Sequence, residues 1–128
     1  MAVDKAKRIL IVDDDRQIRT LLVRVLKVRG WRNIEEAANA VEAQKMIEVS
    51  TFDLIISDWD MPPGMSGLAL LKTVRNDPAL AGLPFILMSG DLTNERRYEA
   101  ADARVSHLFT KPFATLSEFV AKVEKLLS

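Results

Sequence analysis

The sequence predicts an α/β fold in which an open parallel sheet of five strands is covered by five helices on both faces. Short apolar runs recur along the 128-residue chain, and each is followed by a segment whose apolar residues return at helical spacing. The runs are apolar at nearly every position, which is typical of strands buried on both faces. Strands that alternate with helices in this way pair in parallel through right-handed crossovers.

The first two strand and helix units come before residue 50. Arg8–Val12, with its apolar run Ile9–Val12, is expected to form a buried strand, and the amphipathic segment after it continues to Gly30, a residue that commonly ends a helix. Asn33–Ala37 is a shorter candidate strand. Asn39 then offers an N-cap, and Glu42 completes a capping box, so a second helix is expected there.

Three further units fill the rest of the chain. Their expected strands are Phe52–Ser57, Pro84–Met88 and Ser106–Thr110. The third helix is expected to end at Asp77–Pro78, because the residue before a proline avoids the helical conformation. A polar helix is expected over Glu95–Ala101, and a last amphipathic helix follows the capping box of Thr115 and Glu118.

Composition limits the chain to one domain and excludes several kinds of site. With 48% hydrophobic and 28% charged residues, the chain has an ordinary globular composition, so residues 1–128 are expected to form a single domain. Its 18 basic and 18 acidic residues balance, which gives no reason to expect contact with nucleic acid or membrane. The absence of cysteine excludes disulfides, thiolate metal sites and cysteine nucleophiles. Since we find neither a signal peptide nor a long apolar run, a soluble cytoplasmic protein is expected.

Five side chains that carry chemistry fall at the carboxyl ends of the predicted strands. They are Asp13, Asp14, Asp58, Ser89 and Lys111. Open parallel sheets bind their ligands at this edge, beside the point where the strand order reverses, so we expect the five to meet there. Each alone has an ordinary explanation, such as a helix cap for Asp14 or a solvated charge for Lys111. Their matching positions favour a common site.

The three carboxylates predict a magnesium site that supports phosphoryl transfer. Crowded carboxylates repel each other, and a hard divalent cation with oxygen ligands relieves that repulsion. Asp14 and Asp58 are the expected ligands, with Asp13 in the outer shell. Asp58 is the candidate nucleophile, because a carboxylate can attack phosphorus to give an aspartyl phosphate. Mg²⁺, Lys111 and the Ser89 hydroxyl would then balance the charge of the transferring group.

Four short motifs resemble the signature of bacterial response-regulator receiver domains, which act in two-component signalling. They are Val12–Asp14, Ser57–Pro62, Ser89–Gly90 and Lys111–Phe113. The likeness covers almost the whole chain, from about Arg8 to Leu127, and is greatest to the single-domain regulators of chemotaxis. Each motif alone is weak, but the combination is specific. The resemblance implies a doubly wound, flavodoxin-like sheet with strand order 2-1-3-4-5.

The resemblance also implies a role for each residue of the site. Asp58 matches the phosphoacceptor, while Asp13 and Asp14 match the acidic pair that organises Mg²⁺. Asp60 matches the residue whose backbone carbonyl binds the metal. Lys111 matches the lysine that binds the phosphoryl group, and in the family its peptide bond to the following proline is cis.

Two kinds of protein partner follow from the resemblance. A sensor histidine kinase or a histidine phosphotransfer protein donates the phosphoryl group. Ser89, which matches the switch hydroxyl, then moves inward, and the face of the fourth helix, fifth strand and fifth helix binds a downstream protein target. Such a domain is not an enzyme, apart from transferring a phosphoryl group to its own aspartate and hydrolysing it there.

Some residues depart from the family pattern. Leu108 occupies the switch position on the fifth strand, which is usually aromatic. The loop after the acceptor strand is one residue longer than usual and contains Pro62–Gly64. Arg104 stands where glycine is common, and Trp59, beside the acceptor, is expected to be partly exposed and to report on the site by its fluorescence.

Two other functions fit parts of the pattern. Asp58–Asp60 resembles the two-aspartate motif of haloacid dehalogenase phosphatases, but in that family the nucleophile motif opens the chain, whereas here an acidic pair precedes it. The other alternative is a receiver-like domain that acts through protein binding without being phosphorylated. Arg96, Arg97 and Arg104 belong either to a solvated face or to a docking patch for an acidic partner.

Overall fold

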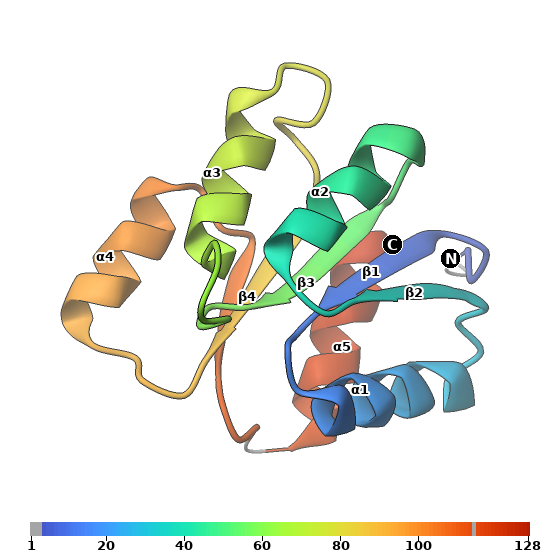
Figure 1. Ribbon diagram of the computed structural model, residues 1–128. Coiled ribbons are helices and arrows are strands. Elements are labelled where there is room, and N and C mark those ends of the chain that lie inside the picture. The colour runs from blue at the N-terminus through green and yellow to red at the C-terminus, as the bar shows by residue number, and fades with distance from the viewer. Residues whose placement is uncertain (1–3, 114) are drawn as a thin grey trace.

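The computed structural model describes residues 4–113 and 115–128, which form a parallel sheet between two layers of helices (Figure 1). The strands are β1 (Arg8–Val12), β2 (Asn33–Ala37), β3 (Leu54–Asp58), β4 (Phe85–Ser89) and β5 (His107–Thr110). The helices are α1 (Arg16–Val28), α2 (Ala40–Val49), α3 (Gly67–Asn76), α4 (Asn94–Asp102) and α5 (Leu116–Leu127). The strand order is β2-β1-β3-β4-β5 and every pair is parallel, which confirms the predicted fold class.

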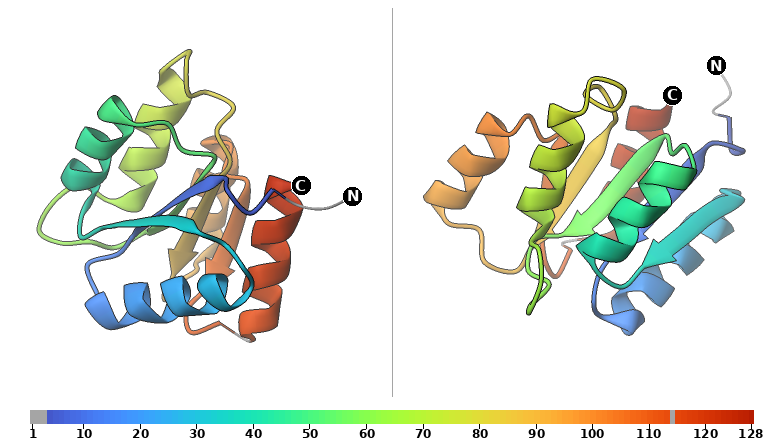
Figure 2. Two further views of the ribbon diagram at one scale, coloured as in Figure 1. Left: turned by 90° about the vertical axis from the view of Figure 1, so that its right-hand side faces the viewer. Right: turned by 45° about the horizontal axis from the view of Figure 1, so that its top comes forward.

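Each face of the sheet has its own apolar core. Figures 1 and 2 show α1 and α5 side by side on one face, and α2, α3 and α4 on the other. Successive strand residues point to opposite faces, so Ile9 and Ile11 belong to the core under α1 and α5. Leu10 and Val12 belong to the core on the opposite side. All four are fully buried, which explains why the run is apolar at every position.

Side chains fix the starts of two predicted helices. Asn39 Oδ1 accepts a hydrogen bond from the backbone N–H of Glu42 at 2.8 Å, and Thr115 Oγ1 accepts one from that of Glu118 at 3.2 Å. Both predicted N-caps are therefore confirmed. None of the helices in the described ranges has the length and apolar character needed to cross a bilayer.

Two strands end one residue later than predicted, and this positions the site. β3 begins at Leu54 rather than at Phe52, and it continues to Asp58. Phe52 is buried outside the strand, where its ring centroid lies 4.8 Å from the Arg8 guanidinium. β4 likewise runs to Ser89. Asp58 and Ser89 are thus the last residues of adjacent strands, and their backbones are held in place by pairing with the neighbouring strands.

The end of α4 explains an unusual arginine. Arg104 follows the C-cap residue of this helix with a φ of 62°, a left-handed conformation that glycine adopts most easily. Its backbone N–H donates to the Ala101 carbonyl at 3.0 Å, and its own carbonyl accepts a hydrogen bond of 3.0 Å from Arg75 Nε. Contacts on both sides hold the arginine in a conformation that costs about 1 kcal/mol for a residue with a Cβ.

Candidate functional site

The five predicted side chains meet at the carboxyl edge of the sheet. Carboxylate oxygens of Asp13, Asp14 and Asp58 lie within 4.8 Å of one another. Asp13 is fully buried and Asp58 is 6% exposed, whereas Asp14 faces solvent. The fold therefore brings together two buried carboxylates and one exposed carboxylate at the edge of the sheet.

Lys111 joins this acidic cluster from the end of β5. Its Nζ lies 3.2 Å from Asp13 Oδ2 and 3.4 Å from Asp58 Oδ1. The peptide bond between Lys111 and Pro112 is cis, as the family resemblance implies. The backbone N–H of Lys111 also donates to the Ser89 carbonyl at 2.8 Å, which ties the lysine to the neighbouring strand.

Burial and charge repulsion set the electrostatics of the cluster. Desolvation, strengthened by the nearby Asp13 carboxylate, raises the pKa of Asp58 to about 6. Desolvation also raises the pKa of Asp13, although that carboxyl accepts hydrogen bonds from Asp15 and Lys111. Burial by itself would lower the pKa of Lys111, but the two carboxylates outweigh it and the pKa is raised. Lys111 is therefore charged, but its single positive charge does not neutralise the neighbouring carboxylates.

The cluster fits a hard divalent cation. Three carboxylates and one ammonium leave an excess of two negative charges when all are ionised. Oxygen donors at this spacing are the ligands that Mg²⁺ prefers, with water or phosphate oxygens in the remaining positions. Burial and repulsion from Asp13 raise the pKa of Asp58, and a bound cation would offset both effects.

Ser89 lies at the end of β4 and is fully buried. Its Oγ accepts a hydrogen bond from the backbone N–H of Asp91 at 3.1 Å and another from Arg96 Nη1 at 3.0 Å. The hydroxyl is thus part of the site edge, as predicted, but its two acceptor positions are already occupied.

Arg96 is the residue of the site that sequence reasoning missed. Its guanidinium forms a two-pronged ion pair with Asp60, each N···O distance being 2.9 Å. That hydrogen-bonded partner lowers the pKa of Asp60. The sequence suggested a solvated face or a docking patch for Arg96, and neither describes it. No local signal could have revealed this contact, because it depends on the position of α4 beside the loop after β3.

Two neighbours of the acceptor are tightly packed, and for one of them this differs from expectation. Trp59 is 4% exposed, so the prediction of a partly exposed ring is wrong. The ring packs into the core, and the Arg96 guanidinium lies 4.8 Å from its centroid. Gly67, at the start of α3, has no room for a side chain, because an added Cβ would lie 2.1 Å from the Asp58 carbonyl oxygen.

The extended loop points away from this packed region. Pro62, Pro63 and Gly64 are all exposed, and the peptide bond between the two prolines is cis. The loop ends are held by the backbone: Trp59 N–H donates to the Met88 carbonyl, and Gly67 N–H donates to the Trp59 carbonyl, each at 2.8 Å. The additional residue therefore lengthens the exposed part of the loop.

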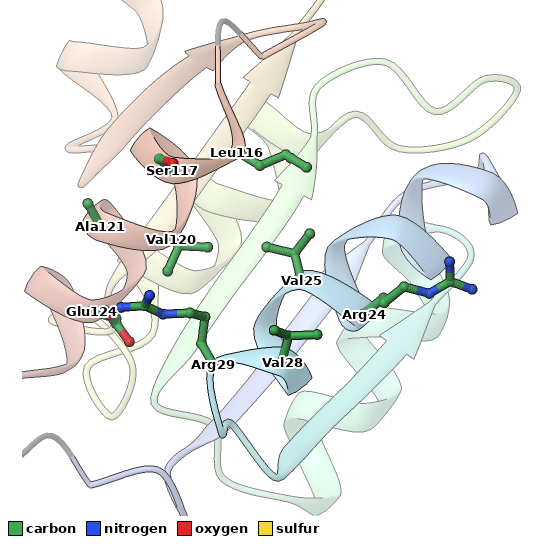
Figure 3. A pocket seen from close by; sticks show the side chains of 9 residues that line it. All are labelled: Arg24, Val25, Val28, Arg29, Leu116, Ser117, Val120, Ala121 and Glu124. Carbon is green, nitrogen blue, oxygen red and sulfur yellow. Dashed lines mark hydrogen bonds and ion pairs between the residues drawn. The ribbon is translucent and has the colours of Figure 1, made fainter.

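A groove of about 510 Å³ lies elsewhere, between α1 and α5 (Figure 3). Val25, Val28 and Val120 line it, and it is flanked by an ion pair of 3.2 Å between Arg29 and Glu124. The walls are mainly aliphatic, whereas the charged groups that predict chemistry gather at the strand ends. The acidic cluster is therefore the candidate site.

Sequence comparison points to one family. The model of the response regulator receiver domain matches residues 9–124 of this chain. Chemotaxis protein CheY-3 of Vibrio cholerae serotype O1 is 37% identical over 123 residues, which are 94% of this chain and 94% of that protein. Chemotaxis protein CheY of Pseudomonas aeruginosa is 36% identical over 119 residues, covering 93% of this chain and 94% of that protein.

Solved structures agree with the sequence comparison. The response regulator receiver protein from Pseudomonas putida has a TM-score of 0.86 and 31% identity, and covers 96% of this chain and 99% of that one. Vibrio cholerae chemotaxis protein CheY4 has a TM-score of 0.86 and 27% identity, with 95% and 99% covered. Similarity over nearly the whole chain shows that this protein belongs to the response regulator receiver family, as a CheY-type receiver of two-component signalling.

Proposed function

We propose that this protein accepts a phosphoryl group on Asp58 from a sensor histidine kinase or a histidine phosphotransfer protein, in a reaction that depends on Mg²⁺. The position of Lys111 carries the proposal, since its ammonium lies 3.4 Å from Asp58 Oδ1. A carboxylate nucleophile and a fixed cation for the phosphoryl oxygens are the two groups that transfer to an aspartate requires.

In the proposed reaction an Asp58 carboxylate oxygen attacks phosphorus. The new P–O bond forms as the bond between phosphorus and the donor histidine nitrogen breaks, and the electron pair stays on that nitrogen. Lys111 Nζ stabilises the phosphoryl oxygens by charge, and the Ser89 hydroxyl donates a hydrogen bond to one of them after moving inward. In hydrolysis a water oxygen attacks phosphorus, the P–O bond to Asp58 breaks, and inorganic phosphate leaves the free carboxylate behind.

The metal ligands in this proposal come from three segments. Asp14 and Asp58 supply carboxylate oxygens, Asp13 stands in the outer shell where Lys111 also binds it, and Asp60 supplies its backbone carbonyl. When bound, Mg²⁺ supplies positive charge beside the transferring group and orients its oxygens. The excess of negative charge among these side chains supports the assignment.

The proposed output is protein binding through α4, β5 and α5. Tyr98 of α4 is 77% exposed, which is unusual for a large aromatic side chain and suits a contact surface. A hollow of about 440 Å³ lies between β5 and α5 and is lined partly by His107 and Phe109. Both features support a partner-binding role for this face, with Ser89 as its link to the acceptor.

Phosphorylation with acetyl phosphate tests the proposal. We expect one phosphoryl group per chain in the presence of MgCl₂, detected by intact-protein mass spectrometry and removed by hydroxylamine, which cleaves acylphosphates. Asp58→Asn should not be labelled. The exposed Asp102 provides the matched control, because Asp102→Asn makes the same chemical change away from the site. Labelling of Asp58→Asn to the wild-type extent would falsify the assignment.

Family membership favours this proposal over the phosphatase hypothesis, since receivers are signalling proteins rather than enzymes that turn over external substrates. Sustained hydrolysis of p-nitrophenyl phosphate distinguishes the two. We expect none beyond the rate of Asp58→Asn. Multiple turnovers that require Asp58 would support the phosphatase instead.

A further inference from the structure

Arg96 connects α4 to the active-site edge through three contacts. Its two terminal nitrogens each lie 2.9 Å from an Asp60 oxygen, and Nη1 also donates to Ser89 Oγ at 3.0 Å. Its guanidinium stacks over Trp59. One side chain thus joins the first turn of α4, the loop after β3 and the end of β4.

These contacts restrain the Ser89 hydroxyl. A guanidinium is planar and presents its donors in a fixed fork, so pairing with Asp60 also fixes the direction of the N–H that reaches Ser89. The Arg96 side chain is 24% exposed and that of Asp60 is 51% exposed, so water screens the ion pair and lowers its contribution to stability. The two-pronged arrangement still sets the orientation of the guanidinium. Ser89 itself is fully buried, so its hydroxyl makes these contacts without competition from bulk water.

The same contacts conflict with the phosphorylated state, and this step rests on the proposed function. A phosphoryl group on Asp58 attracts the Ser89 hydroxyl toward it, which separates Ser89 Oγ from Arg96 Nη1. The backbone N–H of Arg96 is bound to Thr93 Oγ1 at 3.1 Å, at the start of α4. This cap ties the Arg96 backbone to the start of α4, so release of the side chain removes a contact between α4 and the edge of the site.

We propose that Arg96 is a positioning residue that latches the unphosphorylated state by holding Ser89 and Asp60 together. The Arg96 latch, made of these three residues, is broken when Ser89 moves toward the phosphoryl group. It links the acceptor to α4 through Ser89, in a protein whose fifth strand carries Leu108 rather than an aromatic ring. A contact made only in the resting state lowers the affinity for any ligand of the other state.

Beryllofluoride, which occupies the phosphoryl position, provides the test. We would measure its half-saturating concentration at saturating MgCl₂, by fluorine NMR of the bound ligand, in wild type and in Arg96→Met. The methionine keeps much of the apolar stem and removes the donors. We expect the variant to bind about threefold to tenfold more tightly, the range of an ion pair and hydrogen bond at a partly exposed site. Arg97→Met is the matched control, because Arg97 is the next residue of α4 and is exposed.

A second variant tests whether the effect of Arg96→Met comes from loss of the contact with Asp60. Asp60→Asn should change the affinity in the same direction, and the double variant should add little to the larger single effect. In ligand-free Arg96→Met, backbone amide resonances of α4 should shift part of the way toward their beryllofluoride-bound positions.

The outcomes separate the latch from the proposed function. Equal affinity of wild type and Arg96→Met overturns the latch alone. Weaker binding by Arg96→Met also overturns the latch, because that result would show that the guanidinium stabilises the bound beryllofluoride. If beryllofluoride does not bind wild type at all, the proposed function fails and the latch fails with it.

Discussion

The Lys111 ammonium lies 3.4 Å from Oδ1 of Asp58, yet the pKa of that carboxyl is raised to about 6. Attraction to one cation does not offset burial together with repulsion from Asp13, which shares the same lysine at 3.2 Å. The ionised site is thus unfavourable for the folded chain in the absence of metal. In the proposed function the excess negative charge binds a cation, and that cation together with Lys111 then provides the positive charge for a phosphoryl group.

The first prediction concerns pH and stability without metal. A carboxyl whose folded pKa is near 6 and whose unfolded pKa is near 3.8 contributes stability below pH 4 that is lost as the pH rises through 6. In EDTA, Asp58→Asn should therefore be more stable than wild type at pH 7.5, by about 1–3 kcal/mol. Urea unfolding followed by circular dichroism at pH 5 to 8 measures the difference. Parallel pH profiles for the two proteins would contradict it, and Asp102→Asn serves as the control.

Magnesium should reverse this destabilisation. A ligand that binds only the folded state at 100 times its Kd raises the free energy of unfolding by about 2.7 kcal/mol. Asp14→Ala should abolish this gain, and it should also abolish the change in Trp59 fluorescence on adding MgCl₂. Trp59→Phe identifies the emitting residue, because Trp31 belongs to the core on the other face of the sheet. An unchanged titration in Asp14→Ala would place the metal elsewhere.

Ser89 and Leu108 should respond differently to activation. Ser89 has a hydroxyl that a phosphoryl oxygen can attract, whereas Leu108 is only half-buried, is aliphatic and packs against the core near α4. A leucine has no hydrogen bond to exchange, so its rotamers differ little in energy between the two states. In a beryllofluoride complex, Ser89 should shift toward Asp58 while Leu108 keeps its place. Partner binding should be sensitive to Ser89→Ala and tolerant of Leu108→Val. A complex in which Leu108 turns from solvent to core while Ser89 stays in place would refute this.

Two glycines in the same region should differ in how far they tolerate alanine. A Cβ on Gly67 would lie 2.1 Å from the Asp58 carbonyl oxygen, while one on Gly64 would meet nothing within 4 Å. Gly67→Ala should lower the free energy of unfolding by about 1–3 kcal/mol, because the backbone must shift. It should also slow labelling by acetyl phosphate. Gly64→Ala should change stability by no more than about 0.5 kcal/mol. Similar unfolding midpoints for both variants in urea would show that α3 can move away from the Asp58 carbonyl without loss of stability.

The sequence predicts the fold well because its signals are local. Continuous apolar runs reflect burial of a strand on both faces, and caps such as Asn39 act within one turn of the helix. The family motifs add the order of the strands. The approximate boundary at Phe52 is wrong because a buried aromatic residue before a strand has the same pattern as the strand itself.

Predictions about side-chain surroundings fail where they depend on distant elements. Trp59 was expected to be partly exposed from its position next to a surface site, but the core and Arg96 cover it. The contacts of Arg96 depend on where α4 lies, which its polar sequence does not specify. By contrast, the acidic cluster and Lys111 follow strands whose register is set by burial, so their meeting point was predictable.

The loop that holds Pro62–Gly64 is fixed at both ends by the backbone hydrogen bonds of Trp59 and Gly67, while Pro62, Pro63 and Gly64 are exposed. Residues added among these three extend into solvent, whereas Asp60 keeps its ion pair with Arg96 beside the acceptor. Evolution can lengthen this segment without rebuilding the catalytic edge. For protein engineering, the position between Pro63 and Gly64 is a permissive insertion point for a reporter peptide that would sit beside a signalling aspartate.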